Sequence, residues 1–477
     1  MIVLSRATRL SMGTRDQLHI GYVALLASAA ALGGFLFGYD WVVIGGAKPF
    51  YEVYFQLHSP QLIGWANSCA LLGCLIGALI AGEAGSRLGR RRVLLAAAVL
   101  FAASSVLTGW ASTFHSFILW RIVGGIAIGL ASHISPLYIA EVSPATWRGR
   151  LVSLNQLAIV CGILAAQIVN WRIAAFGSGQ NSGTVVFNTW SAQFGWRWMF
   201  TAVAIPSLIF FLSALLIPES PRWLAARNRV REAERVLSRI GGISYAESEL
   251  AAITATLDSE SSSRSHAQNL FRGQMRRLLL IGVCLAVLQQ WSGINILFNY
   301  AEDVYRGAGS GISGIMFDIV ITGAINLVFT LLSFALVDRI GRRRLMLLGC
   351  AGVGVSHLAA GFVYRAGVKG TGVLVLTLCA IACYAMSLAP VTWVLISEIF
   401  PNRVRSFGVS IAVGALWIAS FVLTYTFPVV NATLGTSGAF FLYALFCFLG
   451  FAFVFYCVPE TKGKTLEQIE LVTEANN

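Results

Sequence analysis

Long apolar stretches alternate with short polar ones along nearly the whole chain. Each apolar stretch has about 20 residues or more, the length that an α-helix needs to cross the hydrocarbon core of a bilayer. They form two sets of six, near 20–46, 60–84, 93–112, 114–140, 150–172 and 196–217, and near 276–303, 313–337, 345–364, 371–397, 405–428 and 437–458. The pattern predicts an all-α membrane protein with twelve transmembrane helices in two six-helix halves.

A polar stretch separates the two sets and contains the longest charged run of the chain. Helical spacing around Pro221–Ile240 and Tyr245–Leu257 predicts a short helical domain there, and a disordered linker is the alternative. We therefore expect five parts: an N-terminal segment at 1–19, a six-helix bundle at 20–218, a helical linker domain at 219–274, a second bundle at 275–458 and a C-terminal tail at 459–477.

The distribution of positive charge predicts how the chain is oriented in the membrane. The chain carries 34 Lys and Arg and a net charge of +13, which by itself could suggest a nucleic-acid partner. Most of these residues, 27 of the 34, lie on the side of the two termini; the exceptions are Arg121 within a span and, on the other side, Lys48, Arg172, Arg197, Arg306, Arg365 and Lys369. Because cytoplasmic loops are rich in Lys and Arg, both termini are expected in the cytoplasm and no nucleic-acid partner is expected.

Composition and motifs exclude several other classes. The chain is 57% hydrophobic and 12% charged, about half the charged content of a soluble protein. Its nine cysteines lie in apolar stretches without a CxxC pair, so we expect neither a disulfide framework nor a metal site. HExxH and GxSxG are absent, and we expect no enzyme activity and no cofactor. The expected location is the cell membrane, as a multi-pass monomer in the lipid bilayer.

The seventh apolar stretch contains an unusual run of amides between Leu288 and Tyr300. Gln289, Gln290 and Asn295 surround Gly293, which weakens the helix and allows a break. Because an unpaired amide in lipid costs roughly several kcal/mol, these side chains must face other helices or a wet cavity. Amides both donate and accept hydrogen bonds, which suits a neutral ligand rich in hydroxyl groups. The alternative is that they only link helices.

Three short motifs occur twice, in the same order in both halves. SRLGRRR at 86–92 returns as DRIGRRR at 338–344, EVSP at 141–144 returns as EIFP at 398–401, and PES at 218–220 returns as PET at 459–461. Two homologous six-helix halves are typical of transporters that alternate access by rocking one half against the other.

With these motifs in view, the chain resembles the sugar porter family of the major facilitator superfamily. The matching pieces are GGFLFGYD at 33–40, RIVGG at 121–125, PESPRWL at 218–224, QQWSGIN at 289–295 and PETKG at 459–463. The resemblance runs from about Gly33 to Glu470 and implies the major facilitator fold. The family includes bacterial sugar–proton symporters and animal glucose facilitators.

Asp40 and Arg121 are charged residues within predicted spans. A carboxylate deep in the first span is costly and is a functional hypothesis by default, and Arg121 in the fourth span is its natural partner. The resemblance implies that Asp40 is a proton site and Arg121 its counter-ion, whereas facilitators carry a neutral residue in place of the aspartate. The alternative is a static ion pair that only holds helices together.

The resemblance also implies a cytoplasmic gate and a sugar site. Salt bridges that close the cytoplasmic side are expected from Arg90, Arg91, Glu141, Arg148, Arg342, Arg343, Glu398 and Arg405. Sugar binding is expected from Gln156, Gln289, Gln290, Asn295, Asn326, Tyr384, Trp393 and Trp417. For the two tryptophans the alternative is packing in the core or at an interface.

These observations favour an importer of a monosaccharide, hexose or pentose, coupled to proton symport by alternating access. The partners would be a small sugar and protons. An uncoupled sugar facilitator is the main alternative, and a polyol or inositol transporter or a sugar sensor is a weaker one. An exporter of drug-like compounds would not need the amides of the seventh span.

Overall fold

The computed structural model describes residues 18–177, 187, 189–263, 273–306, 312–368, 371–400 and 405–460. Within this part, eleven helices are long and apolar enough to cross a membrane. One of them, Phe407–Cys457, has 51 residues, about twice the length that one crossing needs. This stretch is part of helix α17 (Arg405–Cys457), which is broken at Gly435, where φ is 70°. The described residues therefore make twelve crossings, as predicted.

The first half is built from long single helices and one composite crossing. The single helices are α1 (Ile20–Tyr54), α2 (Pro60–Leu88), α3 (Arg90–Gly109), α4 (Phe114–Val142) and α5 (Arg148–Gly177). The sixth crossing joins the π-helical turn η1 (Ser191–Gly195) to α6 (Trp196–Thr201) and α7 (Ala204–Leu216).

The second half contains more interrupted helices. Its seventh crossing is divided into α10 (Gly273–Trp291), α11 (Ile294–Asn299) and α12 (Ala301–Arg306). The next crossings are α13 (Ile312–Ile340), α14 (Arg342–Arg365), and α15 (Thr371–Met386) followed by α16 (Leu388–Ile399). Helix α17 supplies the last two.

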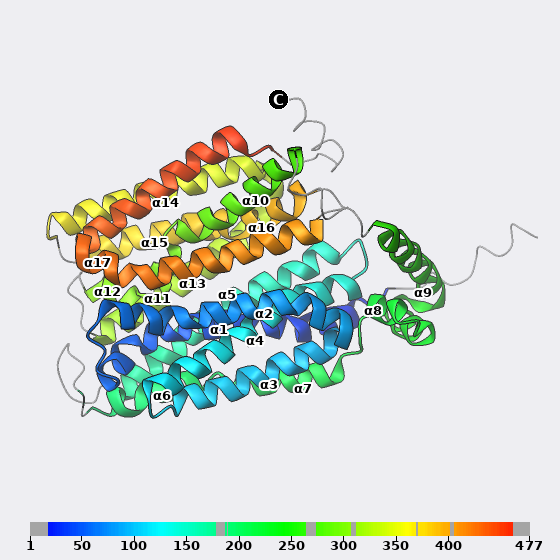
Figure 1. Cartoon of the computed structure of the whole chain (residues 1–477), viewed down its shortest axis with the longest axis horizontal. Coiled ribbons are helices and arrows are strands. Elements are labelled where there is room, and N and C mark those ends of the chain that lie inside the picture. Colours follow the sequence, from blue (N-terminus) through cyan, green and yellow to red (C-terminus); the bar gives the residue numbers. More distant parts are fainter. Residues whose placement is uncertain are drawn as a thin grey trace, which may run out of the picture.

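The two halves lie side by side with their helices roughly along one direction (Figure 1). Across the boundary between them, α2 packs on α17 and α5 packs on α13. The core is largely apolar, and large side chains such as Trp196, Tyr138 and Phe210 are fully buried in it.

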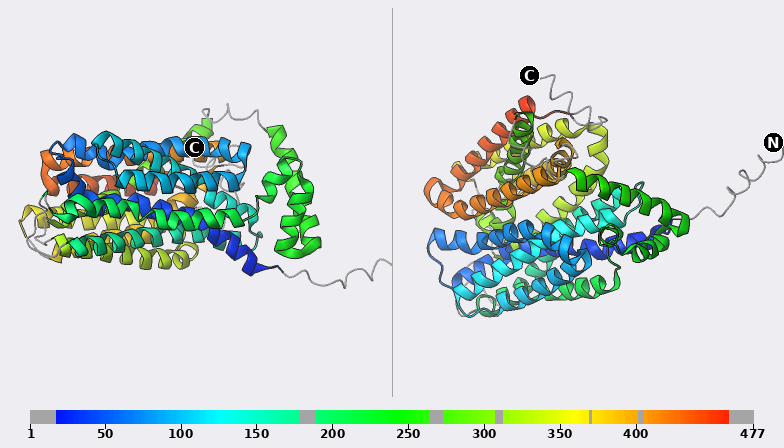
Figure 2. Two further views of the ribbon diagram at one scale, coloured as in Figure 1. Left: turned by 90° about the horizontal axis from the view of Figure 1, so that it is seen from below. Right: turned by 45° about the vertical axis from the view of Figure 1, so that its right-hand side comes forward.

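The polar stretch between the halves forms α8 (Pro221–Ala226) and α9 (Val230–Ser263), so helices occur where the sequence predicted them. Helix α9 bends at Gly241 and Gly242, which have non-helical backbone angles. Figure 2 shows that α8 and α9 lie at one end of the bundle and run across the direction of the other helices. It is attached to the first half: Trp223 donates from Nε1 to the carbonyl of Ser86 at 2.8 Å, and the His19 amide donates to the carbonyl of Ile240 at 2.8 Å.

Candidate functional site

The seventh crossing breaks where the sequence suggested that it could. Gly293 has φ 83° and ψ 0°, the left-handed conformation that favours glycine, and it separates α10 from α11. A Cβ atom at this position would lie 2.7 Å from Cγ of Tyr443. Backbone conformation and packing thus both require glycine here.

The break brings three amides of the predicted sugar site together. Gln289 donates from Nε2 to the carbonyl of Ala389 at 3.2 Å, and its Oε1 accepts from Gln290 at 3.3 Å. Asn295 donates from Nδ2 to Oε1 of Gln290 and, at 3.1 Å, to Oγ of Ser420. All three amides are buried. In this conformation they form a polar chain that connects α10 and α11 to α16 and α17.

The other residues expected at the sugar site lie on five different helices, α5, α13, α15, α16 and α17. Gln156 and Tyr384 are half-buried and Asn326 is buried, while Trp393 on α16 is 39% exposed. Trp417 on α17 is buried, with its ring centroid 5.9 Å from that of Phe37 on α1, so it contributes to the contact between the halves. Among the described residues, no hydrogen bond joins Gln156, Asn326, Tyr384 or Trp393 to the amide chain.

Asp40 and Arg121 form an ion pair in the interior of the first half. Nη1 of Arg121 lies 3.1 Å from Oδ1 and 3.2 Å from Oδ2 of Asp40, and both residues are 3% exposed. The guanidinium carbon also lies 5.3 Å from the centroid of the Phe200 ring, within range of a cation–π contact. Only one guanidinium nitrogen contacts the carboxylate, so the pair lacks the fork geometry of the strongest arginine–carboxylate contacts.

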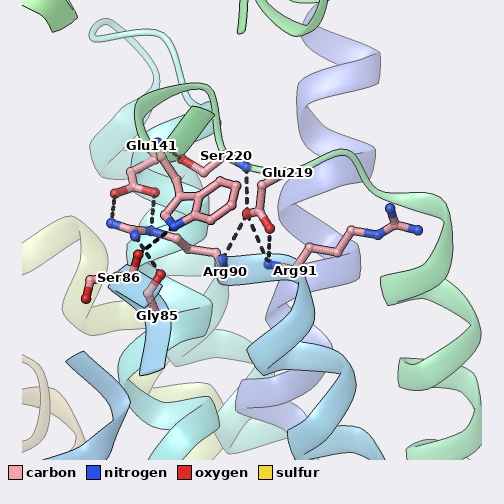
Figure 3. A network of polar contacts seen from close by, with 8 residues as sticks. Gly85, Ser86, Arg90, Arg91, Glu141, Glu219 and Ser220 are labelled. Atoms are coloured by element: carbon pink, nitrogen blue, oxygen red, sulfur yellow. Dashed lines mark hydrogen bonds and ion pairs between the residues drawn. The ribbon is translucent and has the colours of Figure 1, made fainter. Parts of the chain in front are cut away.

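A polar network lies near α8, at the end of the first half that carries the linker helices (Figure 3). Arg90 binds Glu141 through Nε at 2.9 Å and Nη2 at 2.8 Å, and donates from Nη1 to the carbonyl of Gly85. Glu219 accepts from the backbone amides of Arg90, at 2.8 Å, and Arg91, at 3.2 Å. Glu219 thereby satisfies amides that the first turn of α3 leaves without helical partners.

The second half repeats this arrangement in a looser form. Arg342 lies 3.5 Å from Glu398, and Glu460 accepts from the backbone amides of Arg342, at 3.0 Å, and Arg343, at 3.2 Å. The Arg90–Glu141 and Arg342–Glu398 ion pairs each join helices of the same half. Neither bridges the halves in this conformation.

Three other arginines expected at the gate have different surroundings. The guanidinium of Arg91 donates to the carbonyls of Ala214 and Leu215 at the end of α7, and Arg343 donates to the carbonyl of Phe455. Arg148 donates from Nε to the carbonyl of Ala140 at 3.1 Å. These contacts are to backbone carbonyls and not to acidic side chains. Arg405 begins α17, but its side chain lies outside the described residues.

Two polar connections between the halves were not selected from the sequence. Gln167 on α5 is buried and donates to Oγ1 of Thr322 on α13 at 3.4 Å. Lys48 on α1 forms ion pairs with Glu302 and Asp303 on α12. The sequence signal for the second connection was weak: a lysine just after the first apolar stretch and two acids just after the amide run carry opposite charges, but the sequence does not pair them.

Comparison with known proteins gives a consistent assignment. The family model described as "Sugar (and other) transporter" matches residues 26–472. A glucose transport protein of Synechocystis sp. is 39% identical over 470 residues, which cover 96% of this chain and 99% of that one. The D-xylose-proton symporter of Escherichia coli K12 is 35% identical over 489 residues, covering 96% and 97% of the two chains.

Solved structures of the xylose transporter XylE from E. coli share the fold. Its partially occluded inward-open form superposes with a TM-score of 0.82 at 35% identity, covering 93% of this chain and 100% of that one. Its inward-open form also gives a TM-score of 0.82 at 35% identity, with 94% and 100% covered. This chain therefore belongs to the sugar transporter family of the major facilitator superfamily, whose members are multi-pass membrane transporters.

Proposed function

We propose that this protein imports a monosaccharide, hexose or pentose, together with protons by alternating access. The observation that carries the proposal is the buried Asp40–Arg121 pair, with both residues 3% exposed. Named relatives at 35% and 36% identity include a D-xylose-proton symporter and an arabinose-proton symporter. Family, fold and an intramembrane carboxylate thus support the same activity.

Proton binding at Asp40 would change the contact between α1 and α4. A proton on either carboxyl oxygen removes the charge attraction to Arg121, whose Nη1 now lies within 3.2 Å of both oxygens. Arg121 also contacts the Phe200 ring, and this cation–π contact does not require a charge on Asp40. Because α1 also packs on α5, α11 and α12, a change at Asp40 can be transmitted to the boundary between the halves.

The amide chain is the proposed contact for the sugar. Its members now bond to one another and to neighbouring carbonyls and hydroxyls. A bond between neutral groups contributes only about 1 kcal/mol net, so exchanging it for a bond to a sugar hydroxyl costs little. Trp393, which is 39% exposed, offers an aromatic face for the C–H face of a pyranose. Gln156, Asn326, Tyr384 and Trp417 are proposed to line the same site.

We further propose a cytoplasmic orientation for the linker helices and both termini, in the plasma or inner membrane, and a monomeric protein. Under this orientation the Arg90–Glu141 and Arg342–Glu398 pairs lie on the cytoplasmic side. They are proposed to exchange partners across the halves when the protein faces outward, as ion-pair networks with two arrangements allow.

The test is uptake of radiolabelled sugars into proteoliposomes, with and without an inward proton gradient. The panel contains glucose, xylose, galactose and inositol, and Asp40→Asn is measured beside the wild type. With one proton per sugar, a gradient of one pH unit supports accumulation of about tenfold. We expect the wild type to accumulate sugar and Asp40→Asn to retain exchange only. Equilibration without accumulation by the wild type would indicate an uncoupled facilitator, and no uptake of any sugar would refute the ligand class.

A further inference from the structure

A cluster of four charged residues, two of them almost fully buried, connects the two halves. Nζ of Lys48 lies 2.9 Å from Asp303, 3.2 Å from Glu302 and 3.3 Å from Glu52. The side chains of Lys48 and Glu302 are only 3% and 2% exposed. Lys48 and Glu52 belong to α1 in the first half, whereas Glu302 and Asp303 belong to α12 in the second half. One ammonium group therefore binds carboxylates from both halves.

The cluster lies at the end of the bundle opposite the linker helices. Helix α1 begins beside α9, where the amide of His19 donates to the carbonyl of Ile240. Lys48 follows Ile20 by 28 residues, a rise of roughly 42 Å along the helix. Under the proposed orientation this is the outer end.

The backbones of the two halves are in direct contact near the cluster. A Cβ atom on Gly45 of α1 would lie 2.4 Å from the carbonyl oxygen of Phe298 on α11. One on Gly64 of α2 would lie 2.2 Å from the carbonyl oxygen of Tyr425 on α17. The outer end is thus closed in this conformation, and these contacts must separate before a sugar can enter from outside.

We propose that Lys48, Glu302 and Asp303 form an ionic lock that holds the outer end closed, and that Glu52 keeps Lys48 paired when the lock opens. Glu52 follows Lys48 by four residues on the same helix and moves with it. Without Glu52, opening would leave the ammonium with no carboxylate partner from α1. The lock therefore has two arrangements: Lys48 shared among three carboxylates when closed, and Lys48 with Glu52 alone when open.

This arrangement assigns opposite effects to carboxylates that contact the same ammonium group. Neutralising Glu302 or Asp303 removes an attraction between the halves, so it shifts the protein toward the outward-open state. Neutralising Glu52 removes the partner that Lys48 needs when open and relieves repulsion among the three carboxylates when closed, so it shifts the protein toward the outward-closed state. A cluster with only a structural role would make all three substitutions act in the same direction. The inference rests on the proposed alternating access, but not on the identity of the sugar or on proton coupling.

The test is hydrogen–deuterium exchange measured by mass spectrometry on the full chain in lipid nanodiscs, without sugar or a proton gradient. The variants are Glu302→Gln, Asp303→Asn and Glu52→Gln. The control is Glu83→Gln, which neutralises an acid that is 63% exposed and paired with Arg87. Exchange is followed at the outer ends of α1 and α12 and at the opposite end, in the α2–α3 connection.

We expect Glu302→Gln and Asp303→Asn to raise exchange at the outer end by on the order of tenfold and to lower it in the α2–α3 connection. Glu52→Gln should give the reverse pattern, and Glu83→Gln should change neither end. Asp303→Asn serves in place of Glu302→Gln if the latter does not fold. Unchanged exchange in the folded α12 variants, shifts in one direction for all three sites, or loosening at the outer end alone would each overturn the lock. Reciprocal changes in a protein that moves no tested sugar would support the lock and refute the transport proposal.

Discussion

Removing both charges of the Asp40–Arg121 pair should separate its contribution to stability from its contribution to proton coupling. The perturbation is a double-mutant cycle of Asp40→Asn, Arg121→Met and the combined variant. If the pair only holds helices together, the combined variant should still accumulate sugar in a proton gradient. If Asp40 is the proton site, none of the three variants should accumulate sugar, whatever their stability.

The structure sets the order of the expected stabilities. Breaking a buried ion pair by removing one partner costs about 3–5 kcal/mol, because the other charge stays buried. Asp40→Asn should lie near the lower limit, since the amide oxygen can still accept from Arg121 and the Phe200 ring lies 5.3 Å from the guanidinium. Arg121→Met should lie near the upper limit, because the carboxylate loses its ion-pair partner. The combined variant buries no charge at this position and should cost about 2 kcal/mol or less.

The assay combines unfolding in a mild detergent, followed by tryptophan fluorescence, with gradient-driven uptake in proteoliposomes. Equilibrium exchange of labelled sugar in the same vesicles shows whether each variant still binds and moves its substrate. We expect the combined variant to be more stable than Arg121→Met while both fail to accumulate sugar. Accumulation by the combined variant at the wild-type level would refute the assignment of Asp40 as the proton site.

Further predictions concern the helix break and the two polar networks. Gly293→Ala should destabilise the protein by about 1–3 kcal/mol, because it strains a left-handed backbone position and brings a methyl group against Tyr443. Thermal unfolding with and without sugar will measure both this loss and the expected weakening of substrate protection. Glu141→Gln should cost about 2–3 kcal/mol, because Glu141 is nearly buried and receives two short bonds from Arg90. Glu398→Gln should cost less than about 1 kcal/mol, because Glu398 is 29% exposed and its pair is 3.5 Å long. Equal losses of stability in Glu141→Gln and Glu398→Gln would contradict this reasoning.

Sequence patterns predicted the number of crossings because the length and polarity of a span are local properties. The apolar runs gave twelve crossings, and the structure makes twelve within its described residues although the last two are joined in α17. The division in α17 depends on a single backbone position, Gly435, so a hydropathy pattern places it only approximately. The contact between Asp40 and Arg121 was also accessible from the sequence, because two charges within spans have few other ways to be compensated.

Contacts between spans that are distant in the sequence were harder to predict, because they depend on which face each span presents to the other. Lys48 is one charged residue near the end of a span, and nothing in its own neighbourhood indicates that α12 lies beside it. The amides of Gln289, Gln290 and Asn295 were identified as a group, but their bonds to one another depend on the conformation of the protein. Their roles in sugar binding stay predictions, as do those of the residues at the expected cytoplasmic gate.

The attachment of the linker helices to the first half has a consequence for how the protein is made. Trp223 and His19 tie α8 and α9 to helices that precede them in the chain. The first six crossings and the linker can therefore complete these contacts while the ribosome is still synthesising the second half. A gene divided between the codons of Ser263 and Gly273 should then yield two polypeptides, the first of which inserts as a stable unit and waits for the second to assemble beside it.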